Sequence, residues 1–294
     1  MSVLVVGDVI TDIIVIPEGP IVRGSDRRAR IRSRPGGSAA NLAVWLGSLG
    51  VPVRLAARVG AADRDGHAAH LRSRGVEPIL AADPELPSGV LISIVDADGE
   101  RSFLTDRGAN LRLDEADLPA RLLDGVRLVA VSGYSYFAEG PRRAVMALMQ
   151  AARERGIATA VDPASVGFLS EVGAENFLRW TQGTGTIFAN LDEALALTGA
   201  SDPTLQVQML GRVYERVVLK RGAAGAALGT RRGVTLSLPA PARDMVDSTG
   251  AGDAFAAAFL AAGLAGGNDE ACLRAGIDAG ARAIATIGGQ PDQP

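Results

Sequence analysis

The stretch from Asp247 to Phe255, Asp-Ser-Thr-Gly-Ala-Gly-Asp-Ala-Phe, places a candidate anion site next to a candidate proton acceptor. The small residues Gly250 to Gly252 predict a turn, and the uncharged apolar run over 254–264 predicts a helix after it. The free backbone N–H groups and the dipole at such a helix start attract an anion. Asp253 falls in the first helical turn, where its carboxylate would act as a base. Phosphoryl transfer needs both features.

Asp253 also has a purely structural interpretation, in which its side chain caps the helix and the glycines only make a tight turn. Capping residues are common at helix starts, so this stretch alone leaves both interpretations open. The elements that would surround the turn in the fold have to decide between them.

Composition and charge exclude several classes of protein. The chain has 294 residues, 47% of them hydrophobic and 21% charged, as in ordinary globular proteins. A net charge of −3 lacks the electrostatic footprint of a nucleic-acid-binding protein, and no apolar run approaches the roughly 20 residues that span a bilayer. The first residues lack a basic leader, and the single cysteine, Cys272, excludes an intrachain disulfide and a cysteine metal cluster. We expect a cytoplasmic protein without nucleic-acid or membrane partners.

Strand-like runs alternate with helical patterns along the chain. Continuous apolar runs predict buried strands over 3–8, 53–59, 128–132, 157–162, 186–190 and 217–220, with further strands over 226–228 and 234–238. Helical periodicity and capping signals predict helices over 38–50, 65–74, 141–155, 168–178, 191–197, 203–214, 250–264 and 269–285. This alternation predicts an α/β fold whose parallel sheet is covered by helices on both faces.

Two extended segments interrupt the alternation. From Arg28 to Arg34, arginine alternates with other residues, which predicts a strand with one charged face; we interpret most of these arginines as the solvated charges of an edge strand. Residues 90–95 and 101–105 flank Asp96-Ala97-Asp98-Gly99-Glu100, a hairpin signal. We expect these segments to form a small separate sheet that covers a site.

Several polar residues near the first strand and first helix are candidates for ligand contact. Asp8 and Asp12 lie near the strand's carboxyl end, where open α/β sheets bind ligands, although a turn or cap is the alternative for each. The Gly36-Gly37 pair lets a ligand approach the backbone before a helix that we expect Ser38 to cap. Asn41, one turn later, offers both a donor and an acceptor to a hydroxyl.

Other catalytic signatures are missing. The chain has neither the G-x-x-x-x-G-K-[ST] phosphate loop nor a G-x-G-x-x-G motif after the first strand, so the turn at Gly250 is the best candidate phosphate site. The two histidines, His67 and His70, lie three residues apart on an expected surface helix. With no other histidine, a Ser-His-Asp triad is not expected.

Both glycine motifs resemble signatures of the ribokinase-like (PfkB) carbohydrate kinases. Asp247 to Phe255 is similar to the family's carboxyl-terminal signature, and Gly36 to Asn41 with the following helix is similar to its amino-terminal one. The resemblance covers essentially the whole chain, 1–294, as a single domain. It implies a ribokinase-like three-layer α/β/α fold with a mainly parallel central sheet and a small β-sheet lid, built from strands at about 12–34 and 88–107.

The resemblance also implies roles for individual residues. Asp253 would be the base that takes the proton from a substrate hydroxyl. The anion hole around the transferring phosphoryl group would be formed by Gly250, Ala251 and Gly252. The substrate would be held by Asp12, Gly37 and Asn41, with Gly36 shaping the approach.

For ATP and Mg²⁺, the resemblance points to two further motifs. Asn190-Leu191-Asp192-Glu193 is similar to the family's N-x-x-E motif, so Asn190 would lie near the ATP phosphates and Glu193 would hold Mg²⁺ through water. Lys220 to Gly225 is similar to the family's nucleotide loop, so Lys220, Gly222 and Gly225 would contact ATP, with a surface lysine as the alternative for Lys220. In relatives the lid often joins two copies, so the resemblance also implies a homodimer.

The sequence departs from ribokinases proper at three places. Ile10 stands where they usually carry asparagine, and Ser38 stands where they carry lysine, so two polar sugar contacts are missing and ribose is in doubt as the substrate. The tail from Ala283 to Gln290 is a little shorter than the family's usual ending, which leaves activation by K⁺ open.

The function expected from the resemblance is transfer of the γ-phosphate of ATP to a hydroxyl, preferably a primary alcohol, of a sugar or sugar-like substrate. One alternative is a nucleoside kinase, for adenosine or pseudouridine, whose base would be held by Phe103, Tyr134, Tyr136 and Phe137. Another is a catalytically silent sugar- or nucleotide-binding protein on the same fold. A dehydrogenase is disfavoured because the dinucleotide loop is missing.

Overall fold

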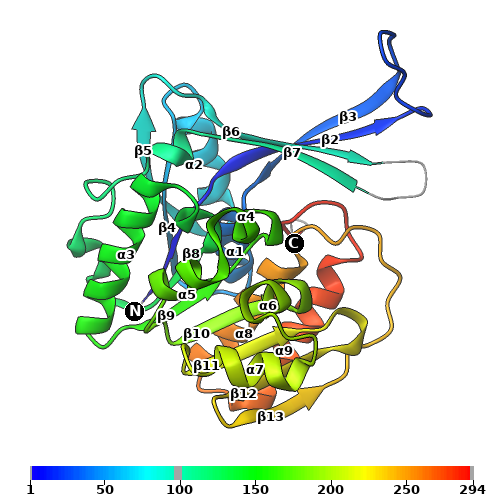
Figure 1. Cartoon of the computed structure of the whole chain (residues 1–294). Helices are drawn as coiled ribbons and strands as arrows, with labels where there is room; N and C mark the ends of the chain where they lie inside the picture. Colours follow the sequence, from blue (N-terminus) through cyan, green and yellow to red (C-terminus); the bar gives the residue numbers. More distant parts are fainter. Residues whose placement is uncertain (1, 96–100, 292–294) are drawn as a thin grey trace.

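A nine-stranded sheet forms the centre of the protein (Figure 1), whose computed structural model describes residues 2–95 and 101–291. The strand order is β13-β12-β11-β10-β9-β8-β1-β4-β5, and all neighbours are parallel except β11-β12 and β12-β13. The strands are β1 (Ser2–Val6), β4 (Val53–Gly60), β5 (Val76–Asp83), β8 (Val126–Ser132), β9 (Ala158–Asp162), β10 (Thr186–Asn190), β11 (Arg216–Lys220), β12 (Ala226–Thr230) and β13 (Gly233–Leu238). The mainly parallel sheet expected from the sequence is confirmed.

Helices cover both faces of this sheet. In β1, Val3 and Val5 point to one buried layer, and Leu4 and Val6 point to the other. The first layer contains α1 (Ser38–Ser48), α2 (Arg64–Ser73), α8 (Ala251–Leu264) and α9 (Asp269–Ala283); the second contains α3 (Glu139–Glu154), α4 (Val166–Val172), α5 (Ala174–Trp180), α6 (Leu191–Thr198) and α7 (Pro203–Leu210). The expected three-layer α/β/α fold is therefore confirmed. Across residues 2–95 and 101–291, none of the helices has the length and apolarity to cross a bilayer.

Some expected element boundaries were wrong. The helix expected over 168–178 is two helices, α4 and α5, because the chain bends at Gly173, whose positive φ of 81° ends one helix and starts the next. The helix expected over 203–214 ends at Leu210, and the edge strand β5 was not predicted. Ser38 is the first residue of α1 rather than its cap, because Gly37 occupies the capping position.

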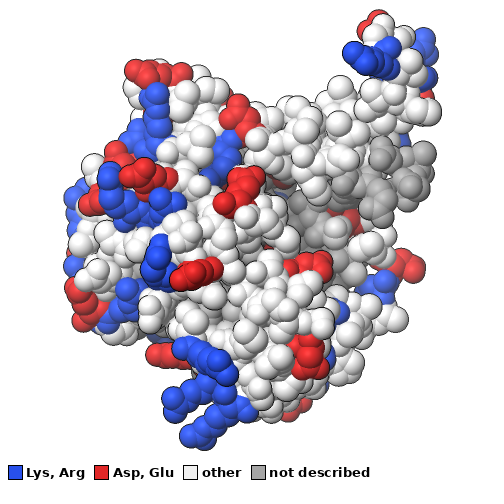
Figure 2. Space-filling view, viewed as in Figure 1, with Lys and Arg blue, Asp and Glu red and all other residues white. Residues whose placement is uncertain are grey.

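A four-stranded sheet, which we call the lid, projects from the body on one side (Figure 1). Its order is β3-β2-β6-β7; β2 and β6 are parallel, and the two outer pairs are antiparallel. The strands are β2 (Ile10–Pro17), β3 (Ala29–Gly36), β6 (Ser88–Val95) and β7 (Arg101–Gly108). The hairpin turn expected at 96–100 lies outside the described residues. Figure 2 shows that charged atoms gather at the tip of the lid, while the visible surface between tip and body is mostly uncharged.

The register of the lid strands separates its two faces. Asp12 pairs with Arg34 on one side and with Leu91 on the other, and Leu91 pairs with Thr105, so these four side chains share the face that turns toward the body. The opposite face, which we call the outer face, carries apolar side chains: Ile13, Val15, Ile31, Ile92, Ile94 and Leu104.

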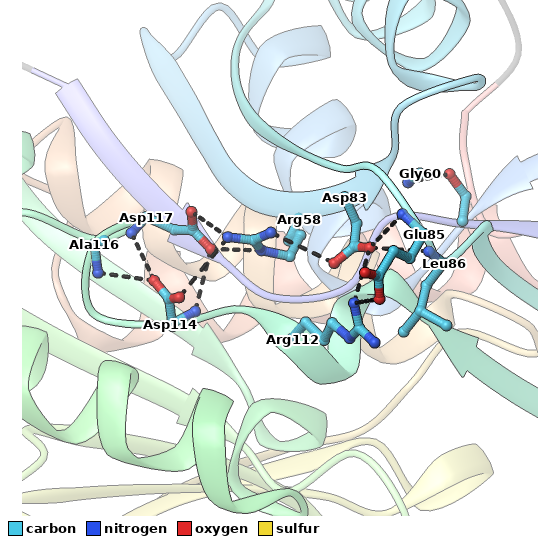
Figure 3. A network of polar contacts seen from close by, with 10 residues as sticks. Arg58, Gly60, Asp83, Glu85, Leu86, Arg112, Asp114, Ala116 and Asp117 are labelled. Carbon is cyan, nitrogen blue, oxygen red and sulfur yellow. Dashed lines mark hydrogen bonds and ion pairs between the residues drawn. The ribbon is translucent and has the colours of Figure 1, made fainter.

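A network of ion pairs fixes the base of the lid (Figure 3). Asp83 ends β5, just before the chain enters β6, and its carboxylate accepts hydrogen bonds from the backbone N–H groups of Glu85 and Leu86. Arg58 of β4 lies 3.5 Å from Asp83, and so does Arg112, which follows β7. The chain entering β6 and the chain leaving β7 are thus held by one buried carboxylate.

We expect Asp83→Asn to destabilise the protein at pH 7. The Leu86 N–H bond, followed by the Glu85 bond and the two arginines, lowers the pKa of Asp83 below its ordinary value. A lowered folded-state pKa adds stability above pH 3.8, the ordinary carboxyl value, and that stability is lost as the pH falls further. The urea midpoint of the variant should therefore lie below that of wild type at pH 7, and the two midpoints should converge near pH 3.

Glu77→Gln on the exposed side of the same strand is the matched control for this experiment. It should leave the unfolding midpoint almost unchanged at both pH values. A gap between Asp83→Asn and wild type that stays constant with pH would contradict the ionic role of Asp83.

Candidate active site

A cleft of about 710 Å³ lies between the lid and the carboxyl ends of the parallel strands. It is next to β1, where the strand order reverses, since chain progression runs to β4 on one side and to β8 on the other. Open α/β sheets bind ligands at this position. The polar residues that line the cleft include Asp8, Asp12, Ser38, Asn41, Asp162, Asn190, Glu193, Lys220, Thr249 and Asp253.

Asp253 connects the two glycine motifs. Its side chain accepts hydrogen bonds from the hydroxyl of Ser38 (2.8 Å, to Oδ1) and from the amide of Asn41 (3.2 Å, to Oδ2). Gly250 occupies the capping position of α8, and Asp253 is the third residue of the helix, with no side-chain capping bond at this end within the described chain. The capping interpretation of Asp253 is therefore wrong.

Burial decides the ionisation of Asp253. Burial raises its pKa to about 7, and the neighbouring negative charge of Asp162 acts in the same direction. The hydrogen bonds from Ser38 and Asn41 and the charge of Lys220 oppose this shift without cancelling it. A carboxylate with a pKa near neutrality is suited to take a proton at physiological pH.

The turn before α8 is braced by the carboxyl-terminal segment. Gly250 has a φ of 74°, and a Cβ there would lie 2.4 Å from the Cα of Gly289, so no other residue fits. The buried carboxylate of Asp247 accepts hydrogen bonds from the backbone N–H groups of Thr249 and Gly288, both at 2.8 Å. This bracing fixes the direction of the N–H groups at the start of α8, as an anion site requires.

Asp12 faces the cleft from the lid. Its side chain is only 7% exposed, and its Oδ1 has no hydrogen-bond partner among the described residues. Burial raises its pKa to about 7, with a smaller contribution from Asp247. A Cβ on Gly36 would lie 2.2 Å from Asp12 Oδ2, so this glycine makes the room that the carboxylate needs. A buried acceptor without a partner is suited to a ligand hydroxyl.

Lys220 lies on the opposite wall of the cleft. Its ammonium is 2.6 Å from the carboxylate of Asp162, and a Cβ on Gly252 would be 3.1 Å from it. Burial alone would lower the pKa of Lys220, but the charges of Asp162 and Glu193 outweigh burial and raise it. Lys220 is therefore a fixed cation beside the turn, and the interpretation as a surface lysine is wrong.

Asn190 and Glu193 form a reciprocal cap at the start of α6. The backbone N–H of Asn190 donates to Glu193 Oε2, and that of Glu193 donates to Asn190 Oδ1, both at 2.8 Å. Burial raises the pKa of Glu193 to about 7, and Asp162 adds to the shift. Both side chains line the cleft, so the N-x-x-E motif builds the helix start and also presents a carboxylate there.

The other wall of the cleft is made by an ion pair and aromatic rings. Arg107 of β7 donates to both carboxylate oxygens of Asp8, at 2.8 and 3.1 Å, and both side chains are buried. Tyr134 and Phe168 stack edge to face with their ring centroids 5.7 Å apart, and both line the cleft together with Phe103.

The structure brings most of the residues singled out in the sequence to this cleft. Among them, Asp12, Gly37, Asn41, Asn190, Glu193, Lys220, Gly250, Gly252 and Asp253 line it, while Gly36 and Ala251 lie directly beside lining residues. Gly222 and Gly225 are not among the lining residues; a Cβ on Gly225 would lie 2.0 Å from the carbonyl oxygen of Leu238, so this glycine serves packing against the end of β13.

Two of the four aromatic residues suggested for a base pocket are elsewhere. Tyr136 is fully buried against Phe177, and Phe137 packs between Phe168 and Phe177 in the second helical layer. The placement of these two in the pocket wall was wrong, because the 3₁₀ helix Gly133–Tyr136 turns them away from the cleft.

Four residues at or beside the cleft were not singled out in the sequence for the contacts they make: Ser38 as a partner of Asp253, Asp162, Arg107 and Phe168. Asp162 ends a predicted strand. The same position singled out Asp8, so the sequence could also have identified Asp162. Ser38 and Phe168 carry no distinguishing local pattern. The partner of Arg107 is 99 residues away in the chain, so only the fold reveals the pair.

A family model described as pfkB family carbohydrate kinase matches residues 1–294. The chain belongs to the PfkB family of carbohydrate kinases. The chain is 32% identical over 302 residues to the bifunctional protein HldE of Shewanella baltica, in an alignment that covers 95% of this chain and 59% of HldE. The chain thus spans less than two thirds of that curated relative.

Solved structures share the fold of this PfkB family member. Adenosine kinase from Sinorhizobium meliloti matches with a TM-score of 0.86 at 24% identity, covering 99% of this chain and 95% of that one. A protein from Escherichia coli described as a putative ribokinase II, in complex with ATP and Mg²⁺, matches with a TM-score of 0.86 at 22% identity, covering 98% of this chain and 94% of that one. The resemblance stated from the two motifs is confirmed, as is the assignment to a carbohydrate kinase family.

Proposed function

We propose that this PfkB kinase transfers the γ-phosphate of ATP to a hydroxyl of a sugar or sugar-like acceptor, with Asp253 as the base. The observation that carries the proposal is the position of Asp253 between the two glycine motifs. Its carboxylate is held by Ser38 and Asn41 from the first motif, and it lies in the first turn of α8, just after the cap at Gly250.

The chemistry follows from this geometry. The acceptor hydroxyl would donate to Asp253, and its oxygen would attack the γ-phosphorus as Asp253 takes the proton. The new O–P bond forms as the bond from the γ-phosphorus to the β–γ bridging oxygen breaks, and ADP leaves. The N–H groups at Gly250 to Gly252 and the Lys220 ammonium would stabilise the charge on the transferring group.

The carboxylate of Glu193 fits a magnesium ion that would be held largely by phosphates and water. Within residues 2–95 and 101–291, no group of three histidine, cysteine, aspartate or glutamate residues is arranged to hold a metal by itself. Mg²⁺ commonly uses only one or two carboxylates in phosphate sites, and Glu193 offers one. When bound, Mg²⁺ would neutralise phosphate charge, while Glu193 would hold its water shell.

On the acceptor side, the unpartnered oxygen of Asp12 would receive one hydroxyl, and the free carbonyl of Asn41 would receive another. An ADP-release screen over sugars, sugar acids, sugar phosphates and nucleosides tests the proposal. At least one acceptor should stimulate ADP release, and Asp12→Asn should raise the KM for it. If the folded protein binds ATP but none of these compounds stimulates ADP release, the result would support a catalytically silent binding protein. It would overturn the proposed kinase activity of this chain.

A nucleoside is the second acceptor class, favoured by the aromatic lining of the cleft. Tyr134, Phe168 and Phe103 face the cleft on the lid side, where a base would stack. A nucleoside preferred over the corresponding free sugar, with the preference lost in Phe168→Ala, would establish this class. Equal turnover of both compounds would favour the sugar.

We propose further that the lid joins two copies into a homodimer. Its outer face carries Ile31 and Leu104, which are 65% and 59% exposed, in a strip of branched apolar residues. Patches of this kind on a sheet commonly mark an interface between proteins. A second copy is the partner that offers the same apolar surface in return.

Leu104→Asp is expected to lower the molar mass observed in solution to that of a monomer, because the carboxylate would be buried in the proposed interface. Light scattering coupled to size exclusion measures this. Leu205→Asp, at another exposed leucine in the first turn of α7, is the control and should leave the mass unchanged. A wild-type protein that is monomeric at micromolar concentration would refute the proposed dimer.

A further inference from the structure

Asp162 is the charged residue at the centre of the cleft to which the family signatures assign no role. It ends β9, and Pro163 after it favours the extended backbone that carries the strand to this point. Its Oδ2 lies 2.6 Å from the ammonium of Lys220, and its Oδ1 accepts a hydrogen bond of 2.9 Å from the backbone N–H of Ala164. Both oxygens are therefore engaged, and the carboxylate has one orientation.

The bend after Asp162 is strained in a way that fixes this orientation. Ala164 has a φ of 72°, the one positive φ of a non-glycine residue among those the structure describes. For alanine this conformation is unfavourable, because Cβ comes too close to the following carbonyl oxygen. The strained turn aims the Ala164 N–H back at the carboxylate, and such strain commonly gathers at functional sites.

The ammonium that Asp162 holds lies against the candidate anion hole. A Cβ on Gly252 would come within 3.1 Å of Lys220 Nζ and 4.0 Å of Asp162 Oδ2. The glycine therefore lets Lys220 approach the first turn of α8. Without Asp162, the flexible lysine side chain would sample other positions, since its four-carbon stem has several rotamers.

We propose that Asp162 is a positioning residue for phosphoryl transfer, whose carboxylate holds the Lys220 ammonium against the Gly250–Gly252 turn. The inference rests on the proposed roles of Asp253 and this turn. In this role Asp162 stabilises the transition state of phosphoryl transfer and does not strengthen the binding of the nucleotide. In the ground state, a carboxylate beside the ATP phosphates repels them, so Asp162 weakens binding of ATP while it improves the placement of Lys220.

The same carboxylate acts on the base. Asp253 faces Ser38 and Asn41 from α1, Asp162 from β9 and Lys220 from β11, and of these groups Asp162 alone supplies negative charge that raises the pKa of Asp253. Asp162 itself also faces Glu193 from α6 and Tyr134 from the loop after β8. Removing the charge of Asp162 would lower the proton affinity of Asp253, which a pH profile detects.

The test compares wild type with Asp162→Asn, which keeps an acceptor for Ala164, and with Asp162→Glu and Lys220→Met. For Asp162→Asn, kcat should fall roughly 10- to 100-fold, less than the 10²–10³-fold typical of losing a direct donor. The dissociation constant of Mg·ATP, measured by calorimetry without acceptor, should stay equal or decrease. The acid limb of the kcat profile should move to lower pH, and Asp162→Glu should restore part of kcat.

The double variant of Asp162→Asn with Lys220→Met tests independently whether Asp162 acts through Lys220. If Asp162 acts through Lys220, Asp162→Asn should lower kcat little further in the Lys220→Met background. The exposed Glu171→Gln is the control and should match wild type in all readouts.

The outcomes separate this inference from the proposed function. Wild-type turnover with an unchanged kcat and pH profile in Asp162→Asn would overturn the positioning role and leave the kinase assignment standing. Loss of Mg·ATP affinity in Asp162→Asn would likewise overturn it, in favour of a ground-state role. Absence of turnover in wild type with every acceptor would instead refute the proposed function.

Discussion

Replacing Asp253 by asparagine is expected to lower kcat by about 10²–10⁴-fold, the usual contribution of a general base. Asparagine fills the same space and still accepts a hydrogen bond from Ser38 or Asn41, so the fold should persist. Wild-type kcat should rise with pH through about 7, because Asp253 must be ionised to take a proton and burial raises its pKa to about that value. The remaining activity of the variant should lack this limb.

Two further carboxylates of the cleft, Asp12 and Glu193, also have pKa values raised to about 7, mainly by burial. The pH profile of wild-type kcat therefore reports the titration of all three carboxylates together. Loss of its acid limb in Asp253→Asn would assign that limb to Asp253. Asp192→Asn, an exposed acid next to Glu193, is the control and should keep both kcat and the limb. Near-wild-type turnover of Asp253→Asn would remove Asp253 from the mechanism.

The same substitution should raise stability. The folded-state pKa of Asp253 is near 7 and the ordinary value is 3.8, so the folded protein binds more protons than the unfolded chain between these values. The carboxylate therefore costs stability as the pH rises through this window. At pH 8 we expect Asp253→Asn to unfold a few degrees above wild type, with the difference vanishing near pH 4. This is the trade between stability and activity expected of a buried base.

The sequence predicted the architecture and the centre of the site because both are encoded locally. The apolar runs of the parallel strands and the glycine turn at Gly250 are continuous stretches whose periodicity and spacing carry the information. Two motifs far apart in the chain then indicated that Asp253 and Asn41 belong together, and the hydrogen bond between their side chains follows from that pairing.

What the sequence left out depends on packing between distant segments. The opposed effects of the helix start and burial on Asp253 could not be weighed until the lid and α1 were seen to enclose it. The expected cap at Ser38 failed because Ser38 is the first residue of α1, and its hydroxyl donates to Asp253 of α8. The register of β2 and β3 places Arg34 opposite Asp12 on the cleft-facing side, so this arginine is half-buried rather than a solvated edge charge.

The buried ion pair between Arg107 and Asp8 joins the lid to the body. Arg107 lies at the end of β7, and Asp8 lies just after β1, at the point where the chain leaves the body for the lid. The side chain of Asn110 strengthens this connection. Its amide oxygen accepts from the backbone N–H of Val9, its amide nitrogen donates to the Val9 carbonyl, and the whole side chain is buried. A change at Arg107 therefore affects the stability of the fold and the orientation of the lid together.

Arg107→Met is expected to destabilise the protein by about 3–5 kcal/mol, because it leaves the carboxylate of Asp8 buried without a counter-charge. Urea unfolding at pH 7 measures the loss. The double variant Asp8→Asn with Arg107→Met should recover much of it, since no buried charge remains. Arg155→Met is the control: its pair with Asp124 is 3.0 Å long but exposed, and removing it should cost at most about 1 kcal/mol.

Kinetic measurements distinguish the effect of Arg107→Met on the orientation of the lid from its effect on stability. At a temperature where the variant is fully folded, a loosened lid should raise the KM for the acceptor more than it lowers kcat, because Asp253 and the Gly250 turn belong to the body and keep their positions. The double variant should regain stability without regaining the wild-type KM, since the link between β7 and Asp8 is still missing. A double variant restored in both respects would show that the pair serves only to neutralise a buried charge.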